Sequence, residues 1–430
     1  MIALDAALRQ RAAEQRPIQV ALVGAGVTGR SIALQLLTPP PGIRLAAIVN
    51  RTLANAIRAY REGGIEHVAE VGTAGALQTA IEAGEYAVTG DAAVACAAGG
   101  IDVIVEATGT IDFAASVTEL AIAGGKHVVL VNAELDSTLG PILAARAVRA
   151  GLVLTNTDGD EPGVAMTLLR YLRSLGLYPV GAGNIKGMVD YYRTPETQRA
   201  FAERFGQDAR KVTSFADATK LSMEATILAN ATGFRVGRRG MYGPACSHVN
   251  EVADRLPAEL LLGDGLVDYA LGAAPHTGAF VIIHEPHPLK RHHLGYYKLG
   301  EGPFYVFHTP FHLPHIQIAS TIGRAALAGD ATVTPLGGPV CEVVAIAKRD
   351  LRAGDVLDGV GGFTTYGLVD NADTARREQA LPMGLSEGCV LTRNVSKDAV
   401  VRLDAVTRPP HRHADRLWAE QAAHWPQEAS

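Results

Sequence analysis

The sequence has little of what marks disulfide-linked, zinc-binding, membrane or nucleic-acid-binding proteins. Its four cysteines lie far apart and include no CxxC pair, so neither a disulfide framework nor a zinc site is expected. Its apolar runs are short and are interrupted by glycine, proline or charged residues, which argues against a membrane span. Lys and Arg total 39 against 44 Asp and Glu residues, without the basic excess that nucleic-acid binding requires.

The chain has 430 residues, 48% of them hydrophobic, which is enough for two or three domains with buried cores. Its first residues, "MIALDAALRQRAAEQRP", are typical of an amphipathic surface helix rather than a signal peptide. We therefore expect a cytoplasmic protein with mostly buried, reduced thiols and with no membrane or nucleic-acid partner.

A glycine motif lies at a predicted strand-to-helix turn near the start of the chain. "PIQVALVGAG" is a short apolar run with β-branched residues, and "VTGRSIALQLL" then takes up helical spacing. In a GxGxxG motif the first glycine permits the turn, the second lets the pyrophosphate approach the backbone, and the third allows close packing of helix and strand. The predicted cofactor-binding residues here are Gly24, Gly26, Val27, Thr28 and Gly29.

Further buried-strand runs follow the motif, and each leads into helical spacing. They are "IRLAAIVN", "GIDVIVEATG" and "GKHVVLVNAE". This alternation predicts a doubly wound parallel sheet, the Rossmann fold, whose ligand crevice lies beyond the carboxyl ends of the strands. We therefore expect Thr108, Gly109 and Asn132 to contact the nicotinamide. Glu134 is either a catalytic acid or a first-turn carboxylate of a helix.

The end of the second predicted strand lacks the acidic residue that holds the ribose hydroxyls of NAD. Asn50 stands there, so a 2′-phosphate would meet no repelling carboxylate. Arg51 and Thr52 then offer a guanidinium and a hydroxyl to that phosphate. These three residues favour NADP(H) over NAD(H); the alternative is that Arg51 is only a solvated residue at a helix start.

We expect a dinucleotide-binding domain over residues 1–157, a substrate-binding and oligomerisation domain over 158–330, and a small β-rich domain with a tail over 336–430. A helix over 311–329 is expected to return to the first domain. The fold class is therefore α/β for the first domain and α+β for the second.

One predicted helix in the middle of the chain carries a single charged stripe. In "DATKLSMEATILANATG" the charged residues are Asp217, Lys220 and Glu224, which fall within about 60° of one another at 100° per residue. A nearly apolar helix with one such stripe favours a stripe that faces a polar cleft. The alternative is a solvent-facing Lys220–Glu224 pair at i, i+4.

Several blocks together resemble the homoserine dehydrogenases: "VGAGVTG", "VEATG", "HVVLVNAELD", "DGDEPG" and "DATKLSMEATILANATG". The resemblance implies that Lys220 and Asp217 serve catalysis and substrate binding. Later blocks, among them "GNIKG", "YYKLGEGPFYVFHTPFHLPH" and "LPMGLSEGC", resemble a narrower group of such oxidoreductases with a C-terminal SAF (antifreeze-like) domain. That group includes a 1-deoxy-D-xylulose-5-phosphate reductoisomerase-like enzyme of isoprenoid biosynthesis.

The sequence departs from true homoserine dehydrogenases at one catalytic position. Those enzymes carry a lysine directly after the Asn of a T-A-N-K run, whereas Ala133 follows Asn132 here. The spacing from Asp217 to Lys220 is also shorter than in that family. Both differences argue against homoserine as the substrate.

The remaining candidates for substrate contact lie outside the charged stripe. Lys186 follows a predicted strand and is either a second catalytic lysine or a turn residue. Two lysines that face one substrate would suit an anionic, for example phosphorylated, molecule. Asp160 and Glu161, with Glu224, are predicted to bind substrate. Lys348, Arg349 and Tyr366 in the C-terminal domain either close over the active site or are structural.

A metal site is not predicted. Eight of the fourteen histidines fall between His276 and His315, but no spacing aligns them as ligands on one element. The alternative is a divalent ion that helps a reductoisomerase to chelate its substrate.

The residues and the resemblance together predict an NADP(H)-dependent reductase or reductoisomerase that acts on a small polar hydroxy-carbonyl compound. The alternatives are a homoserine dehydrogenase and a non-catalytic NADP-binding regulator. The resemblance also implies a homodimer or homotetramer.

Overall fold

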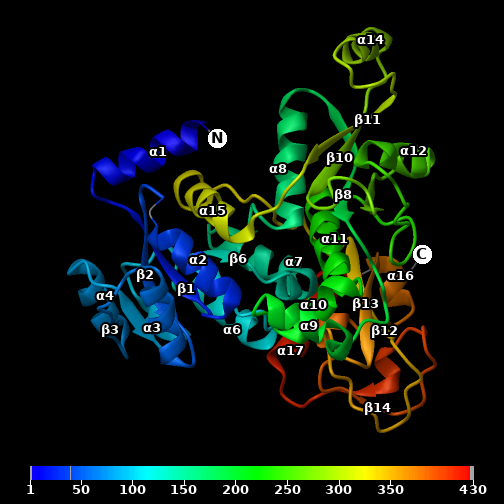
Figure 1. Cartoon of the computed structure of the whole chain (residues 1–430). Helices are drawn as coiled ribbons and strands as arrows, with labels where there is room; N and C mark the ends of the chain where they lie inside the picture. Colours follow the sequence, from blue (N-terminus) through cyan, green and yellow to red (C-terminus); the bar gives the residue numbers. More distant parts are fainter. Residues whose placement is uncertain (1, 39, 427–430) are drawn as a thin grey trace. The chain divides into compact units, whose positions relative to one another are not determined.

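The computed structural model describes residues 2–38 and 40–426, which divide into two compact units. Unit 1 comprises residues 1–160 and 313–334, and unit 2 comprises residues 161–312 and 335–430. The two units are coloured along the chain in Figure 1. Among the described residues, no helix combines the length and the apolar character needed to cross a membrane.

Unit 1 is built on a seven-stranded parallel sheet. Its strand order is β3-β4-β2-β1-β5-β6-β7, so the chain first builds one side of β1 and then crosses to the other. The strands are β1 Ile18–Val23, β2 Ile43–Val49, β3 Ala69–Glu70, β4 Ala87–Thr89, β5 Val103–Glu106, β6 His127–Leu130 and β7 Leu154–Asn156. The predicted doubly wound α/β fold is confirmed by this order.

The helices of unit 1 follow the strands and cover the sheet. They are α1 Ile2–Ala13, α2 Val27–Leu37, α3 Leu53–Glu62, α4 Ala74–Glu82, α5 Ala92–Ala97, α6 Asp112–Ala123, α7 Ala133–Arg149 and α15 Pro314–Ala328. The core holds Val20 and Leu22 of β1, Ile32 of α2, and Ile318 and Ile322 of α15, all fully buried or nearly so. Burying such side chains supplies most of the free energy that holds this layer together. In Figure 1, α15 lies beside α1 and α2 although it is about 300 residues distant from them in sequence.

Unit 2 contains a four-stranded mixed sheet in the order β11-β10-β8-β9. Its strands are β8 Tyr178–Lys186, β9 Leu266–Leu271, β10 Ala279–His284 and β11 Phe304–Thr309; β8 and β9 are parallel, and the other pairs are antiparallel. The helices α8 Glu161–Ser174 and α11 Thr219–Thr232 pack against β8 and against each other. The other helical segments within residues 161–312 are α9 Pro195–Arg204, α10 Ala209–Ala216, η1 Val249–Glu251, α12 Val252–Arg255, α13 Ala258–Leu262 and α14 Pro288–Tyr296.

The C-terminal part of unit 2 is rich in short β segments. Two antiparallel pairs are formed by β12 Cys341–Ala347 with β13 Thr365–Asn371 and by β14 Val390–Leu391 with β15 Val406–Thr407. They are joined by α16 Ala372–Arg377, η2 Met383–Leu385 and η3 Leu403–Ala405, and α17 His413–His424 follows. A small β-rich module was predicted for this region, and these two-stranded sheets agree with it.

The prediction that Asp217, Lys220 and Glu224 share one helix is wrong for Asp217. Asp217 is the C-cap of α10, and Ala218 adopts a left-handed conformation, φ 72° and ψ −6°, before α11 begins at Thr219. A non-glycine residue in this region interrupts a right-handed helix. Lys220 and Glu224 therefore share a face of α11, whereas Asp217 does not belong to that helix.

Candidate functional site

The glycine motif of unit 1 forms the turn between β1 and α2. Gly24 has φ +103°, and a Cβ there would lie 2.9 Å from the Ala107 carbonyl oxygen; a Cβ on Gly29 would lie 2.0 Å from the Gly24 oxygen. Gly26 is the exposed N-cap of α2, and a Cβ there would have no heavy atom within 4 Å. The first and third glycines thus allow close backbone packing, while the second leaves open space at a helix N-terminus. Such a place suits a phosphate group, and the partly exposed Val27 and Thr28 form the first turn beside it.

Asn50 is a structural part of this glycine turn. Its Oδ1 accepts a hydrogen bond from the Ala25 backbone N–H at 3.0 Å, and its Nδ2 donates to the Thr52 carbonyl oxygen at 2.8 Å. The amide therefore joins the end of β2 to the turn, a task that the sequence prediction did not include. Arg51 and Thr52 are exposed directly after it.

A buried carboxyl group lies at the ends of β5 and β6, where Thr108 and Asn132 were expected to contact the nicotinamide. Glu106 is fully buried and accepts hydrogen bonds from the Thr108 N–H at 2.8 Å, from the Thr108 hydroxyl, and from Asn132 Nδ2 at 2.9 Å. Burial raises the pKa of the Glu106 carboxyl and the hydrogen-bond donors lower it. Burial is the larger effect, so the pKa is raised to about 7.

The expected contact of Asn132 with a cofactor is not supported, because its amide is fully buried and already bonded. Its Oδ1 caps α7 by accepting from the Leu135 N–H at 3.0 Å, and its second Nδ2 hydrogen goes to the Thr110 carbonyl at 2.7 Å. Glu134 lies partly exposed in the first turn of α7. Thr108 is partly exposed and Gly109 is exposed, and both remain candidates for cofactor contact.

In unit 2, three side chains, Asn184, Lys186 and Lys220, converge on two buried carboxylates, Glu161 and Glu224. Lys186 ends β8, and its Nζ lies 2.7 Å from Glu161 Oε1 and 3.4 Å from Glu224 Oε2. Lys220 Nζ lies 4.0 Å from the other oxygen of Glu224. Asn184, two residues before Lys186 on the same strand face, donates from Nδ2 to Glu224 Oε2 at 2.7 Å. We call Glu161, Asn184, Lys186, Lys220 and Glu224 the charged cluster.

The burial of the charged cluster is graded. The side chains of Glu161 and Glu224 are 5% and 2% exposed, whereas those of Lys186 and Lys220 are 18% and 11% exposed. The carboxylates thus lie beneath the ammonium groups, so Glu224 holds both lysines rather than presenting itself to solvent. Paired charges so far from water are costly to bury, and in folded proteins they commonly serve a site.

One more side chain of unit 2 joins the charged cluster. Glu161 is the first residue of α8, where the helix dipole favours a carboxylate, and its Oε2 lies 3.3 Å from His312 Nδ1. Carboxylate and imidazole groups are both metal ligands, so this pair marks where a divalent ion would find its donors in unit 2. Asp160 directly precedes Glu161, is buried, and belongs to unit 1.

Asp217, predicted to be catalytic, is held by groups other than those of the charged cluster. It is fully buried, and its carboxylate accepts from the Thr219 N–H at 3.0 Å and from Lys348 Nζ at 2.8 Å. Its lack of exposed surface and its bonds to Thr219 and Lys348 do not support the direct role that the resemblance implies. Of the C-terminal candidates, Lys348 and Tyr366 are buried and Arg349 is exposed. Tyr366 donates its hydroxyl to Asp398 at 3.1 Å and stacks on Tyr191.

Asn184, His312 and Glu106 were not among the site residues predicted from the sequence. Asn184 had a signal, since it precedes Lys186 at strand spacing in "GNIKG". His312 was hidden among the many histidines of its region, and only the fold distinguishes it. Glu106 was visible at the end of a predicted strand but was given no task.

Residues 159–318 match the family model described as "Oxidoreductase DRL, catalytic domain". This match covers less than half of the chain and includes most of the charged cluster's unit. A search of curated proteins found no match. The protein is an oxidoreductase enzyme.

Several solved dehydrogenase structures are similar to the chain at low identity. The myo-inositol dehydrogenase from Lactobacillus casei, in complex with NAD(H) and myo-inositol, is 11% identical with a TM-score of 0.41, over 75% of this chain and 89% of that one. The myo-inositol 2-dehydrogenase from Lactobacillus plantarum is 13% identical with a TM-score of 0.39, over 73% and 91%. An NAD binding oxidoreductase from Klebsiella pneumoniae is 19% identical with a TM-score of 0.30, over 41% of this chain and only 44% of that one. At such values the likeness carries no conclusion about activity or substrate.

Proposed function

We propose that the protein is an NADP(H)-dependent reductase or reductoisomerase that acts on a small polar hydroxy-carbonyl compound, with 1-deoxy-D-xylulose 5-phosphate as the first candidate. The observation that carries this proposal is the pair of ammonium groups, Lys186 and Lys220, held by the one buried carboxylate of Glu224. An oxidoreductase needs a group that stabilises charge on the substrate oxygen, and the charged cluster offers two cations for it.

The residues of unit 1 fit a dinucleotide. The open space at Gly26 and the free approach to the N-terminus of α2 suit the pyrophosphate, and the exposed Arg51 and Thr52 suit a 2′-phosphate. When bound, the nicotinamide supplies or accepts the hydride of the reaction.

In unit 2 the charged cluster would bind and polarise the substrate. Lys220, the less exposed of the two lysines, would donate a hydrogen bond or a proton to the carbonyl oxygen that gains charge as its carbon receives hydride. Lys186 would hold an anionic or hydroxyl group of the same molecule. Glu224 and Asn184 would fix the direction of both lysines, because the carboxylate accepts from Asn184 and faces the two ammonium groups.

Turnover measurements separate the candidate activities. NADPH oxidation should be followed with 1-deoxy-D-xylulose 5-phosphate and a panel of small hydroxy-carbonyl compounds, and NADP reduction with homoserine. We expect turnover with at least one carbonyl compound and none with homoserine. Activity on homoserine would replace the proposed substrate class, and tight NADPH binding without any turnover would favour a regulator.

We also propose that the protein is a homodimer or a homotetramer. In unit 2, β11 is an edge strand of the four-stranded sheet, and Tyr296 and Tyr297 near the end of α14 are more than 70% exposed. Figure 1 shows α14 projecting from the four-stranded sheet of unit 2, in the connection between β10 and β11. Exposed aromatic side chains and open edge strands are both typical of association surfaces. Light scattering at micromolar concentration should give at least twice the 45.2 kDa chain mass; a species of the chain mass alone would refute the proposal.

A further inference from the structure

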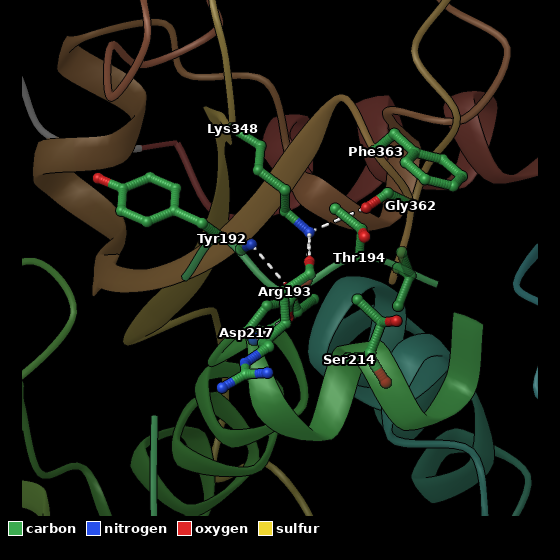
Figure 2. Close-up of polar contacts among 12 residues, drawn as sticks. Tyr192, Arg193, Thr194, Ser214, Asp217, Lys348, Gly362 and Phe363 are labelled. Carbon is green, nitrogen blue, oxygen red and sulfur yellow. Dashed lines mark hydrogen bonds and ion pairs between the residues drawn. The ribbon is translucent and has the colours of Figure 1, made fainter. Parts of the chain in front are cut away.

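Lys348 is a buried lysine whose three ammonium hydrogens all have acceptors. It follows β12, and its side chain is 3% exposed. Its Nζ donates to Asp217 Oδ2 at 2.8 Å, to the Arg193 carbonyl oxygen at 2.8 Å and to the Gly362 carbonyl oxygen at 2.9 Å. Figure 2 shows the ammonium group between Arg193 and Gly362. One side chain therefore joins the end of β12 to two loops and to the end of α10.

Asp217 links Lys348 to Thr219, the first residue of α11. Its Oδ2 accepts from Lys348, and its Oδ1 accepts from the Thr219 N–H at 3.0 Å. Between them Ala218 is held in the left-handed conformation, which is unfavourable for a residue with a Cβ atom. Surrounding contacts must hold such a residue in place. The Asp217 carboxylate does so by binding the backbone N–H of Thr219, on the far side of Ala218.

A second contact fixes the same helix start from the same β pair. The Gly367 N–H on β13 donates to Thr219 Oγ1 at 2.9 Å. The β12–β13 pair and the residue after β12 therefore bind the start of α11 at two points. Lys348 binds Asp217, which precedes the helix, and Gly367 binds Thr219, its first residue. The next residue is Lys220, whose ammonium lies in the charged cluster one turn before Glu224.

We propose that Lys348 is a positioning residue, which through Asp217 fixes the start of α11 and thereby the direction of Lys220. The inference rests on the proposed function, in which Lys220 polarises the substrate. It assigns to the C-terminal β-rich part a task in the reaction without direct contact with the substrate. Stability alone is a weak explanation for the pair, because well-packed apolar residues often replace a buried ion pair without loss.

The test compares two double variants that each remove one buried ion pair. Lys348→Met alone would leave the Asp217 charge buried without its partner and is expected to fold poorly. Lys348→Met with Asp217→Asn removes both charges and keeps an oxygen for the Thr219 N–H. The control is Arg376→Met with Glu342→Gln. This pair joins β12 to α16 rather than to the start of α11, and it has an N–O distance of 2.9 Å and side chains 13% and 9% exposed.

We expect the Lys348/Asp217 double variant to bind NADPH like the wild type and to keep its KM, while its kcat falls about ten- to a hundredfold, as for a displaced catalytic group. The control should lose stability and keep kcat. Unchanged kcat in a folded Lys348/Asp217 double variant would overturn the proposal, as would an equal loss of kcat in the control.

A second measurement needs no substrate. Hydrogen–deuterium exchange in a peptide over residues 217–224 should become at least several-fold faster in the Lys348/Asp217 double variant and remain unchanged in the control. Unchanged exchange in both would overturn the proposal. If the wild type turned over none of the carbonyl compounds, the proposed function would fail, and the exchange comparison would still decide whether Lys348 holds the start of α11.

Discussion

The glycine turn of unit 1 and the charged cluster of unit 2, the two proposed ligand sites, are built from opposite kinds of groups. The turn presents backbone and small side chains, and its polar contacts are made by an uncharged amide, Asn50, within 30 residues of chain. The charged cluster presents four ionic side chains from elements that begin at residue 161 and end at residue 232, with two carboxylates almost completely buried. The glycine turn offers open space and uncharged backbone groups, whereas the charged cluster consists mainly of ionic side chains.

This difference has a physical consequence for how each site responds to mutation. Backbone donors at a helix N-terminus remain when a neighbouring side chain changes, so the glycine turn should lose affinity in small steps. Buried charges depend on one another, because removing one ammonium leaves a carboxylate uncompensated. Substitutions in the charged cluster should therefore have large effects on turnover, while those at the turn should shift cofactor preference.

The largest effect is expected for Lys220→Met. The change keeps most of the side-chain volume and removes the cation near Glu224, so turnover should fall by about a hundredfold or more, as for the loss of an acid or base. NADPH affinity should stay nearly constant, because the glycine turn belongs to the other unit. Steady-state kinetics and a fluorescence titration with NADPH check both expectations.

Two further variants control this experiment. Lys220→Arg should restore little activity, since a guanidinium is permanently charged and cannot donate a proton. Lys290→Met removes a lysine that is 54% exposed on α14 and should leave turnover unchanged. Full activity in Lys220→Met would remove this residue from the mechanism and make Lys186 the next candidate.

A smaller effect is expected for Arg51→Ala. If the exposed guanidinium binds the 2′-phosphate, its loss should weaken NADPH binding by about tenfold, the value of one hydrogen bond to a charged group. NADH binding should not change, because NADH lacks that phosphate. Fluorescence titrations with both cofactors measure the ratio. A wild type that already prefers NADH would show that Arg51 is only a solvated residue.

The contrast between the two sites also explains what could be predicted from the sequence. The parts of the glycine turn lie close together in the chain, so the strand run, the three glycines and the helix spacing were visible at once, and the parallel sheet followed from repeats of that pattern. The task of Asn50 was not visible, because whether an amide at a strand end faces a ligand or the Ala25 N–H depends on atomic positions.

The charged cluster could be predicted only in part. Lys220 and Glu224 share a helix face, and their spacing predicted their proximity. Asp217 was assigned to the same face because helical periodicity contains no sign of the left-handed Ala218. Its actual partner, Lys348, lies 131 residues further along the chain, and such pairings are set by tertiary packing rather than by local pattern.

The smallest effect is expected at Glu106, whose buried carboxyl is the exception to the contrast between an uncharged site in unit 1 and a charged one in unit 2. Burial raises its pKa to about 7 in the folded protein from an ordinary value of 4.5. Between these values the folded state holds the proton more tightly than the unfolded state, so stability should fall as the pH rises from about 4.5 to about 7.

Glu106→Gln should remove this slope, because glutamine does not titrate. The variant also carries a constant penalty, since its amide group must face Asn132 Nδ2, which donates to the native carboxyl. The melting temperature of the wild type should therefore exceed that of the variant by an amount that shrinks by a few degrees as the pH rises from about 4.5 to about 7. Thermal melts across this range measure the difference, and Glu70→Gln, an exposed residue of β3, serves as the control that should keep the wild-type profile. A difference that stays constant or grows with pH would mean that the three donors around Glu106 outweigh its burial, and that unit 1 keeps an ionised carboxylate beside its glycine turn just as unit 2 keeps its own in the charged cluster.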